Sequence, residues 1–211
     1  MKKDVIFIID RSGSMSGLES DTIGGFNGLI EKQKLVEGDV YISTVLFDDH
    51  IEWLDERCPL KEIKPLNAER YFVRGTTALL DAIGSTLTKM SKVYHELKSE
   101  KPEKVMVVIV TDGLENASRE YSLNVVKSLV HTFQEEAKWE FLFLGANIDA
   151  VETGASIGID RRRTANYHAD KDGLKHNYMA VEKAMHEFRT QGTVSEKWRE
   201  DLDKDFKGRK K

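Results

Sequence analysis

Two uninterrupted apolar runs, each closing on an aspartate, constrain the fold of this chain more than any other feature. Residues 5–9 read Val-Ile-Phe-Ile-Ile and are followed by Asp10, and residues 105–110 are followed by Thr111 and Asp112. Apolar runs without polar alternation are typical of strands buried on both faces, as in parallel sheets that helices cover on each side. The two runs therefore predict an α/β fold in which both aspartates lie at strand ends.

The rest of the chain alternates between helical and strand patterns. Apolar residues at helical spacing predict helices over residues 18–36, 77–97, 122–137, 149–157 and 174–189. Further strands are predicted over residues 40–47, 140–145 and 164–168. Because strands that alternate with helices form mostly parallel sheets, we expect a doubly wound, mostly parallel, Rossmann-like sheet with helices on both faces. Gly24 and Gly25 fall inside the first helix, where we expect them to allow close packing on the sheet.

One edge of the sheet is predicted to be an antiparallel hairpin. The strand over residues 40–47 is separated from residues 50–54, which begin with an alternation of polar and apolar residues, only by Asp48 and Asp49. A two-residue link can join only antiparallel strands. The following residues 55–75 contain two prolines and are expected to be irregular.

Length and composition agree with one domain and a charged tail. The chain has 211 residues, of which 40% are hydrophobic and 32% charged, as is usual for a globular domain. We assign residues 1–191 to a single domain and residues 192–211 to a C-terminal tail. Apolar residues recur every fourth position in this tail, at Val194, Trp198, Leu202 and Phe206. That spacing predicts an amphipathic helix that docks on the domain or on a partner.

Several classes of protein are disfavoured by the sequence. A net charge of −4 gives no sign of a nucleic-acid-binding surface. No stretch approaches the roughly 20 apolar residues of a membrane-spanning helix. Cys58 is the single cysteine, which excludes an intrachain disulfide. The first apolar run is too short for a secretory signal, so we expect a cytoplasmic protein.

Three predicted loops carry oxygen-bearing side chains. Asp10, Ser12 and Ser14 follow the first strand, Asp112 follows the second run, and Thr77 opens a helix after a glycine. The carboxyl ends of parallel strands meet at one edge of a sheet, so these loops are expected to lie together. Oxygen ligands suit Mg²⁺, which binds in octahedral geometry and keeps several water molecules. A divalent cation site is therefore predicted at this edge.

The order of these residues resembles the von Willebrand factor A (VWA) family. Its metal-ion-dependent adhesion site (MIDAS) has the form Asp-x-Ser-x-Ser, then Thr, then Asp, which this chain matches with Asp10, Ser12, Ser14, Thr77 and Asp112. The resemblance implies that these five residues hold Mg²⁺ or Mn²⁺. It also implies that the serines contact the ion directly, as the threonine sometimes does, and that the aspartates often act through water. A partner's Asp or Glu would complete the shell.

The resemblance further suggests what kind of VWA protein this is. It points to a small, stand-alone, cytoplasmic member of bacterial type, whose partner could be a chaperone-like ATPase or a stress-system protein. One position is ambiguous, because the family often has Gly-Gly-Thr where this chain has Gly75, Thr76 and Thr77. Aligning the Ala-Leu-x-Asp-Ala that follows selects Thr77, and Thr76 stays an alternative. Either threonine could also cap the helix that begins near residue 78.

Other polar groups have simpler expected roles in turns, loops or helix caps. These groups are Glu115 and Asn116; Asn147 and Asp149; Asp48, Asp49 and His50; and Arg161, Arg162 and Arg163. Capping is expected for Asp149 and a hairpin turn for residues 48–50. The two site aspartates are expected to lie outside the core, so that substituting both would leave the fold intact.

Two function classes fit a cation at the strand ends. The first is a non-enzymatic, metal-dependent protein-binding module. The alternative is a Mg²⁺-dependent phosphoryl-transfer or phosphatase-type enzyme. A phosphatase of the haloacid dehalogenase type would need a second aspartate where Ser12 stands, and no Walker lysine follows a glycine-rich loop. We therefore favour the binding module and predict no catalytic residue.

Overall fold

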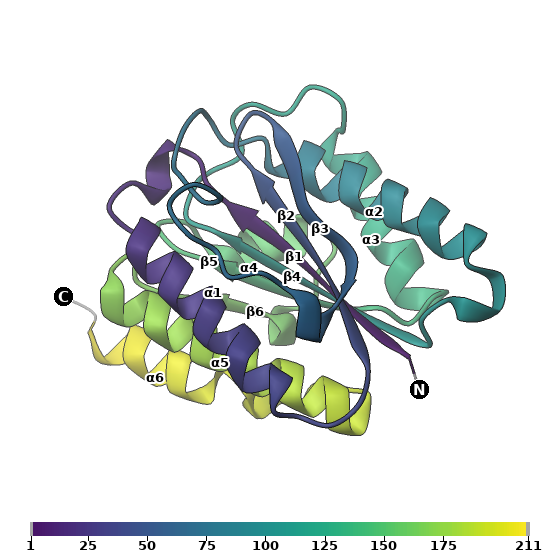
Figure 1. Ribbon diagram of the computed structural model, residues 1–211. Coiled ribbons are helices and arrows are strands. Elements are labelled where there is room, and N and C mark those ends of the chain that lie inside the picture. Colours follow the sequence, from purple (N-terminus) through teal and green to yellow (C-terminus); the bar gives the residue numbers. More distant parts are fainter. Residues whose placement is uncertain (1, 210–211) are drawn as a thin grey trace.

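The computed structural model describes residues 2–209 and has a six-stranded sheet at its centre. Its strands lie in the order β3-β2-β1-β4-β5-β6 (Figure 1). Their bounds are β1 Lys3–Asp10, β2 Val40–Phe47, β3 Ile51–Pro59, β4 Lys104–Thr111, β5 Glu140–Gly145 and β6 Thr164–Asn166. All neighbouring strands are parallel except β2 and β3, which form an antiparallel edge pair. The predicted fold class is confirmed.

Helices cover both faces of this sheet. On one face lie α1 Glu19–Lys34, α5 Lys171–Gln191 and α6 Glu200–Gly208; on the other lie α2 Leu79–Glu96, α3 Leu123–Glu135 and α4 Ala150–Ser156 (Figure 1). Short 3₁₀ turns join them at η1 Gly13–Met15, η2 Leu60–Glu62, η3 Lys98–Glu100, η4 Arg161–Arg163 and η5 Glu196–Arg199. The two layers give the sheet the two-sided cover that its apolar strands require.

The core is divided into two halves by the alternation of side chains along the strands. In β1, Val5, Phe7 and Ile9 pack toward α1 and α5, whereas Ile6 and Ile8 pack toward α2 and α3. Every residue of β1 is buried. Successive side chains of a strand point to opposite faces, so the centre of a strand that is covered on both sides favours apolar residues on both, as at residues 5–9. This explains why the run is uninterrupted.

Strand β3 is longer than the sequence suggested. Residues 55–59 were expected to be irregular, but they pair with β2 as far as Pro59. The pairing shifts register near Thr44, and Arg57 has a positive φ of 47°. A bulge of this kind interrupts the two-residue alternation from which a strand is read. The terminal proline is tolerated because β3 is an edge strand.

The glycines of α1 allow close packing, but against a helix and not against the sheet. A Cβ atom added at Gly25 would overlap the ring of Tyr178 in α5, while one added at Gly24 would meet no atom within 4 Å. The missing side chain of Gly25 therefore lets α1 and α5 approach each other.

The C-terminal residues pack against the domain. Val194, Trp198 and Leu202 are buried in the core half formed with α1 and α5. The Trp198 indole donates to the Arg162 carbonyl at 3.0 Å, and the Phe206 ring stacks on His168 with centroids 4.7 Å apart. The apolar spacing of the tail thus corresponds to η5 and α6, whose apolar side faces the domain.

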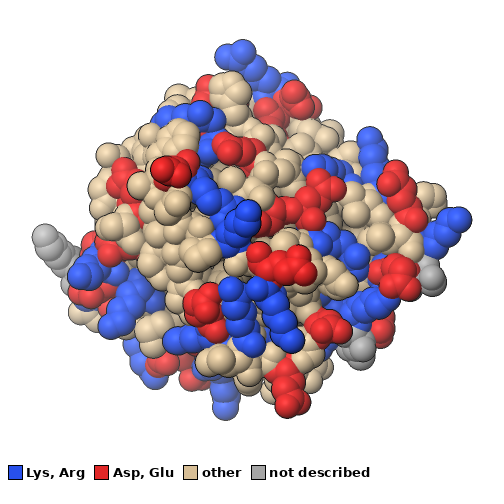
Figure 2. Space-filling model, viewed as in Figure 1, with Lys and Arg blue, Asp and Glu red and all other residues tan. Residues whose placement is uncertain are grey.

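The visible surface carries both signs of charge. Lysine and arginine side chains alternate with aspartate and glutamate over the face shown in Figure 2, without a broad region of one sign. Within residues 2–209, no helix combines the length and the apolar character that crossing a bilayer would need.

Candidate metal centre

The structure brings the five predicted site residues to one end of the sheet. Strands β1 and β4 are parallel neighbours that pair up to Ile9 and Val110, so Asp10 and Asp112 follow at the same edge. The Ser12 hydroxyl lies 3.0 Å from that of Ser14. The Thr77 hydroxyl, which arrives from the segment before α2, donates to the Ser12 hydroxyl at 2.9 Å. Three hydroxyl oxygens thus converge beside two strand-end carboxylates.

Asp10 is fixed by hydrogen bonds to both of its carboxylate oxygens. Its Oδ1 accepts from the Ser12 amide at 2.7 Å, and its Oδ2 accepts from the Thr111 hydroxyl at 2.5 Å. Burial raises the pKa of Asp10, and the hydrogen bonds from Thr111 and Ser12 oppose that rise. Sequence reasoning missed Thr111, although it is a polar residue at the end of an otherwise apolar run. Its hydroxyl ties the end of β4 to the end of β1.

Asp112 is the opposite case, because it is buried without a partner. Neither carboxylate oxygen has a hydrogen-bond partner within residues 2–209, and the residue is only 2% exposed. Burial raises the pKa of Asp112 to about 6; the Ser14 hydroxyl, which lies nearby but outside hydrogen-bonding geometry, opposes the rise, and the charge of Asp10 adds to it. Leaving a carboxylate desolvated and unpaired is unfavourable. A bound cation would relieve this, so the site fits the divalent ion that its oxygen donors suggest.

Both aspartates were expected to lie outside the core, and this was wrong. Asp10 and Asp112 are 0% and 2% exposed, because the loops that follow β1 and β4 fold over the strand ends. Asp10 in particular holds hydrogen bonds that bind two strands together. Its replacement by alanine would therefore disturb the fold as well as the site.

Gly113 makes room for the converging hydroxyls. A Cβ atom at this position would lie 2.7 Å from the Thr77 hydroxyl oxygen and 2.9 Å from that of Ser14. Contacts this short are not tolerated, so a glycine is required for space. The neighbouring loops are also joined by their backbones, since the Gly13 amide donates to the Gly75 carbonyl at 3.1 Å. The site is a cradle formed by three chain segments.

The two candidate threonines differ in position. Thr77 is 3% exposed and directs its hydroxyl to Ser12, whereas Thr76 is exposed. The N-cap of α2 is Ala78, without a side-chain hydrogen bond, so Thr77 does not cap this helix. The geometry places Thr77 beside the other hydroxyls, as the alignment suggested, and its role as a ligand stays a prediction.

Glu115 and Asn116 hold the backbone around Thr77 and the start of α2. The Asn116 side-chain oxygen accepts from the Thr77 amide at 2.9 Å. The Glu115 carboxylate accepts from the amides of Leu80, Ala117 and Ser118. Glu115 was expected to be a solvated loop residue, but it turns inward and holds the start of α2. No local pattern could reveal this, because one of its partners lies 35 residues away in the sequence.

Asp48, Asp49 and His50 form a second group of possible ligand atoms, all within 4.8 Å of one another. The buried Asp48 is already engaged, because its Oδ2 accepts from Arg11 Nε at 3.0 Å and from Arg74 Nε at 2.7 Å. Its Oδ1 accepts from the His50 amide at 2.7 Å, as a hairpin turn requires. The group therefore joins the loop around Arg74 to the end of β1, and its charge is balanced by arginine.

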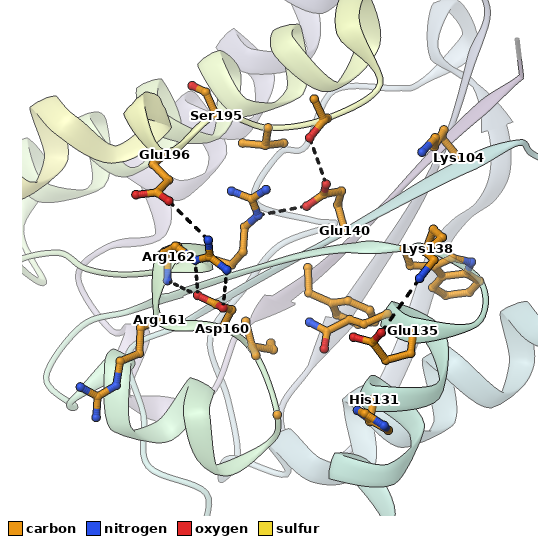
Figure 3. A pocket seen from close by; sticks show the side chains of 18 of the residues that line it. Lys104, His131, Glu135, Lys138, Glu140, Asp160, Arg161, Arg162, Ser195 and Glu196 are labelled. Carbon is orange, nitrogen blue, oxygen red and sulfur yellow. Dashed lines mark hydrogen bonds and ion pairs between the residues drawn. The ribbon is translucent and has the colours of Figure 1, made fainter.

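A hollow lies at the opposite end of the sheet, where β4 and β5 begin. This cavity of about 1110 Å³ is lined by charged residues from η4, η5, the end of α3 and the starts of β4 and β5 (Figure 3). Arg162 pairs with Asp160 and Glu196, and Arg163 pairs with Glu140. Arg161 and Arg162 are exposed, as expected for a solvated loop, and among the described residues that line this hollow no buried polar side-chain atom lacks a partner. Asp149 caps α4, as predicted.

Similar structures were found among solved proteins, although no family model and no curated protein sequence matches. Proximal thread matrix protein 1 of the mussel byssus is 14% identical, with a TM-score of 0.58 over 88% of this chain and 46% of its own. Its form with a zinc-occupied MIDAS motif is 13% identical, with a TM-score of 0.58 over 87% of this chain and 46% of its own. The ArnB paralog VWA2 of Sulfolobus acidocaldarius is 20% identical, with a TM-score of 0.52 over 89% of this chain and 45% of its own.

At these identities the similarity establishes the fold. The chain has the fold of VWA-domain proteins, as the residue pattern implied. It spans about half the length of the proteins it matches first.

Proposed function

We propose that the chain is a divalent-cation-dependent protein-binding module. Asp10, Ser12, Ser14, Thr77 and Asp112 would hold Mg²⁺ or Mn²⁺, and a partner's aspartate or glutamate would complete the coordination. The observation that carries the proposal is the buried, unpaired carboxylate of Asp112 beside three converging hydroxyls. The zinc-occupied MIDAS of a protein with the same fold supports a cation at this place.

The electrostatics of the site favour an acidic partner. A bound divalent cation supplies a Lewis-acidic centre that a carboxylate can join. Both oxygens of Asp10 are occupied by protein donors, and the three hydroxyls are neutral. Asp10 would lower the positive charge of the ion from a distance, whereas Asp112 has oxygens that accept no hydrogen bond among the described residues and could contact the ion directly. The remaining charge attracts an incoming carboxylate.

The surroundings of the site agree with this polarity. The Glu115 carboxylate accepts hydrogen bonds from the Leu80 amide at the start of α2 and from the Ser118 amide of its own loop. Arg74, on the loop that contacts the Ser12–Ser14 turn, keeps 46% of its side chain exposed. An acidic segment would thus meet an arginine at the rim. From the resemblance alone, we propose that this acidic segment belongs to a chaperone-like ATPase or a stress-system protein in the cytoplasm.

Cation binding is the first experiment. Isothermal titration of the chelator-treated protein with Mg²⁺ and Mn²⁺ should show one site, and Asp112→Asn should abolish it. Asp49→Asn is the matched control, because Asp49 is an exposed carboxylate next to the buried Asp48. Undiminished binding by Asp112→Asn, or equal loss in Asp49→Asn, would overturn the proposed site.

The structure gives no support to a phosphatase. Asp10 occupies the strand end where a nucleophilic aspartate would stand, but both of its oxygens accept hydrogen bonds from fixed donors. Position 12 is a serine, so the chain lacks the second aspartate that a phosphatase of the haloacid dehalogenase type would carry there. A screen of phosphate monoesters with Mg²⁺ and Mn²⁺ should therefore show no turnover that depends on Asp10.

A further inference from the structure

Two buried tyrosines reach the ends of the two strands that carry the site aspartates. The Tyr71 hydroxyl donates to the Asp10 carbonyl at 2.7 Å, and the Tyr167 hydroxyl donates to the Thr111 carbonyl at 3.2 Å. Both tyrosines are 1% exposed. They come from different parts of the fold, Tyr71 from the segment between η2 and α2 and Tyr167 from the residue after β6. Two separate segments thus each place a tyrosine hydroxyl on the carbonyl at the end of a site strand.

These carbonyls control the orientation of the metal-binding loops. The Asp10 carbonyl belongs to the peptide plane that leads into the Ser12–Ser14 turn. The Thr111 carbonyl belongs to the plane that leads into Asp112. A peptide unit is planar, so a hydrogen bond to its oxygen restricts the backbone torsions on both sides. Each tyrosine therefore fixes the direction in which the chain leaves its strand.

The tyrosines suit this role chemically. A tyrosine hydroxyl is protonated at neutral pH, so both hydroxyls act as donors to these carbonyls. The two bonds are not equivalent, because the Thr111 carbonyl also accepts from the Ala146 amide at 3.0 Å. The bond from Tyr71 is shorter. Loss of the Tyr71 hydroxyl should therefore disturb its loop more than loss of the Tyr167 hydroxyl.

We propose that Tyr71 and Tyr167 are positioning residues for the cation site, which rests on the proposed metal-binding function. Their hydroxyls donate to main-chain carbonyls, and they act by holding the peptide planes that place Asp10, the serine turn and Asp112. Outer groups that orient ligands commonly change metal affinity roughly tenfold or more when they are removed.

Tyr178 provides a matched control within the same region. It is 4% exposed and lies in α5 against Gly25, but its hydroxyl has no hydrogen-bond partner within the described residues. Tyr178→Phe therefore removes a buried hydroxyl without releasing a strand-end carbonyl. It should leave cation affinity unchanged, and it should not lower the stability of the metal-free protein.

The experiment compares three Tyr→Phe variants of the full chain. Mn²⁺ affinity is measured by calorimetry well below the unfolding temperature, and the spectrum of bound Mn²⁺ by electron paramagnetic resonance. Unfolding is followed separately in excess chelator. We expect affinity about tenfold weaker in Tyr71→Phe, a smaller loss of roughly threefold in Tyr167→Phe, and no change in Tyr178→Phe. The Mn²⁺ spectrum should change in the first two variants only.

The outcomes separate this inference from its premise. If the unaltered protein binds no Mn²⁺ or Mg²⁺, the proposed function itself is wrong. If it binds and both Tyr71→Phe and Tyr167→Phe retain its affinity and spectrum, only the positioning role is wrong, even where their stability in chelator falls. Tyr167→Phe keeps the test open if Tyr71→Phe does not fold. An equal loss of affinity in Tyr178→Phe would show a general effect of buried hydroxyls and would also overturn the inference.

Discussion

Gly113→Ala should destroy the cation site by adding a single methyl group. The Cβ atom would lie 2.7 Å from the Thr77 hydroxyl oxygen and 2.9 Å from that of Ser14, closer than such atoms approach. Gly113 is not among the residues with positive φ, so alanine fits the backbone and only space is at issue. Both hydroxyls must move, and Thr77 has little freedom because it is 3% exposed. Two of the three converging oxygens would leave the site.

The expected magnitude separates function from stability. Inserting a methyl group into a packed region costs about 1–3 kcal/mol. A protein of this size would then unfold at a temperature lower by roughly 2–10 °C, still above assay temperature. Mn²⁺ affinity should fall by at least about tenfold, since displacing one oxygen ligand already weakens the shell more than an outer group does.

Calorimetric titration of Gly113→Ala, with unfolding measured in chelator, provides the test. Gly28→Ala is the control, because a Cβ at this α1 position meets no atom within 4 Å. It should bind Mn²⁺ normally and gain up to about 1 kcal/mol of stability from helix propensity. Wild-type affinity in Gly113→Ala would refute the role of these hydroxyls in holding the ion.

Three further predictions follow from other contacts. Arg189→Ala removes a buried guanidinium that donates to the carbonyls of Gln33, Val36 and Gly38 at the end of α1, and denaturant unfolding should show a loss of about 2–3 kcal/mol. Trp198→Ala empties a site that is 1% exposed, and the melting temperature should fall by roughly 10 °C, whereas a solvated tail would show no change. A partner bound through the ion should be released by chelator but retained when salt is raised, and the opposite pattern would indicate general charge attraction.

The parts of the fold that could be predicted are those whose surroundings dictate residue type. Strands β1 and β4 are covered on both faces, so their central residues 5–9 and 105–110 are all apolar and the runs are unmistakable. The order of elements then fixes a mostly parallel sheet, and parallel neighbours put Asp10 and Asp112 at one edge. The location of the candidate site follows from these facts without any knowledge of side-chain contacts.

The parts that could not be predicted depend on partners far apart in the sequence. The Thr111 hydroxyl donates a hydrogen bond to Asp10, which lies 101 residues away in the sequence. Asp48 accepts one from Arg11, which lies 37 residues away. Neither residue type reveals which distant group it will contact. The sequence therefore predicts the set of ligands but not the hydrogen bonds that orient them. The prediction of where β3 ends was wrong for a local reason, because a shifted register hides the alternation on which strand prediction depends.

The contrast between the two aspartates leads to a last prediction, on stability. Asp10 has donors for both oxygens and Asp112 has none, so the metal-free protein carries one buried carboxylate that the fold does not compensate. Asp112→Asn removes that charge while keeping the shape, and in chelator it should raise the free energy of unfolding by about 1 kcal/mol. With saturating Mg²⁺ the order should reverse, because only the unaltered protein gains stability from the ion. Denaturant unfolding of both proteins, with and without Mg²⁺, measures the two differences. If Asp112→Asn is less stable in both conditions, Asp112 serves the fold, and the view that it is left unpaired for a cation is wrong.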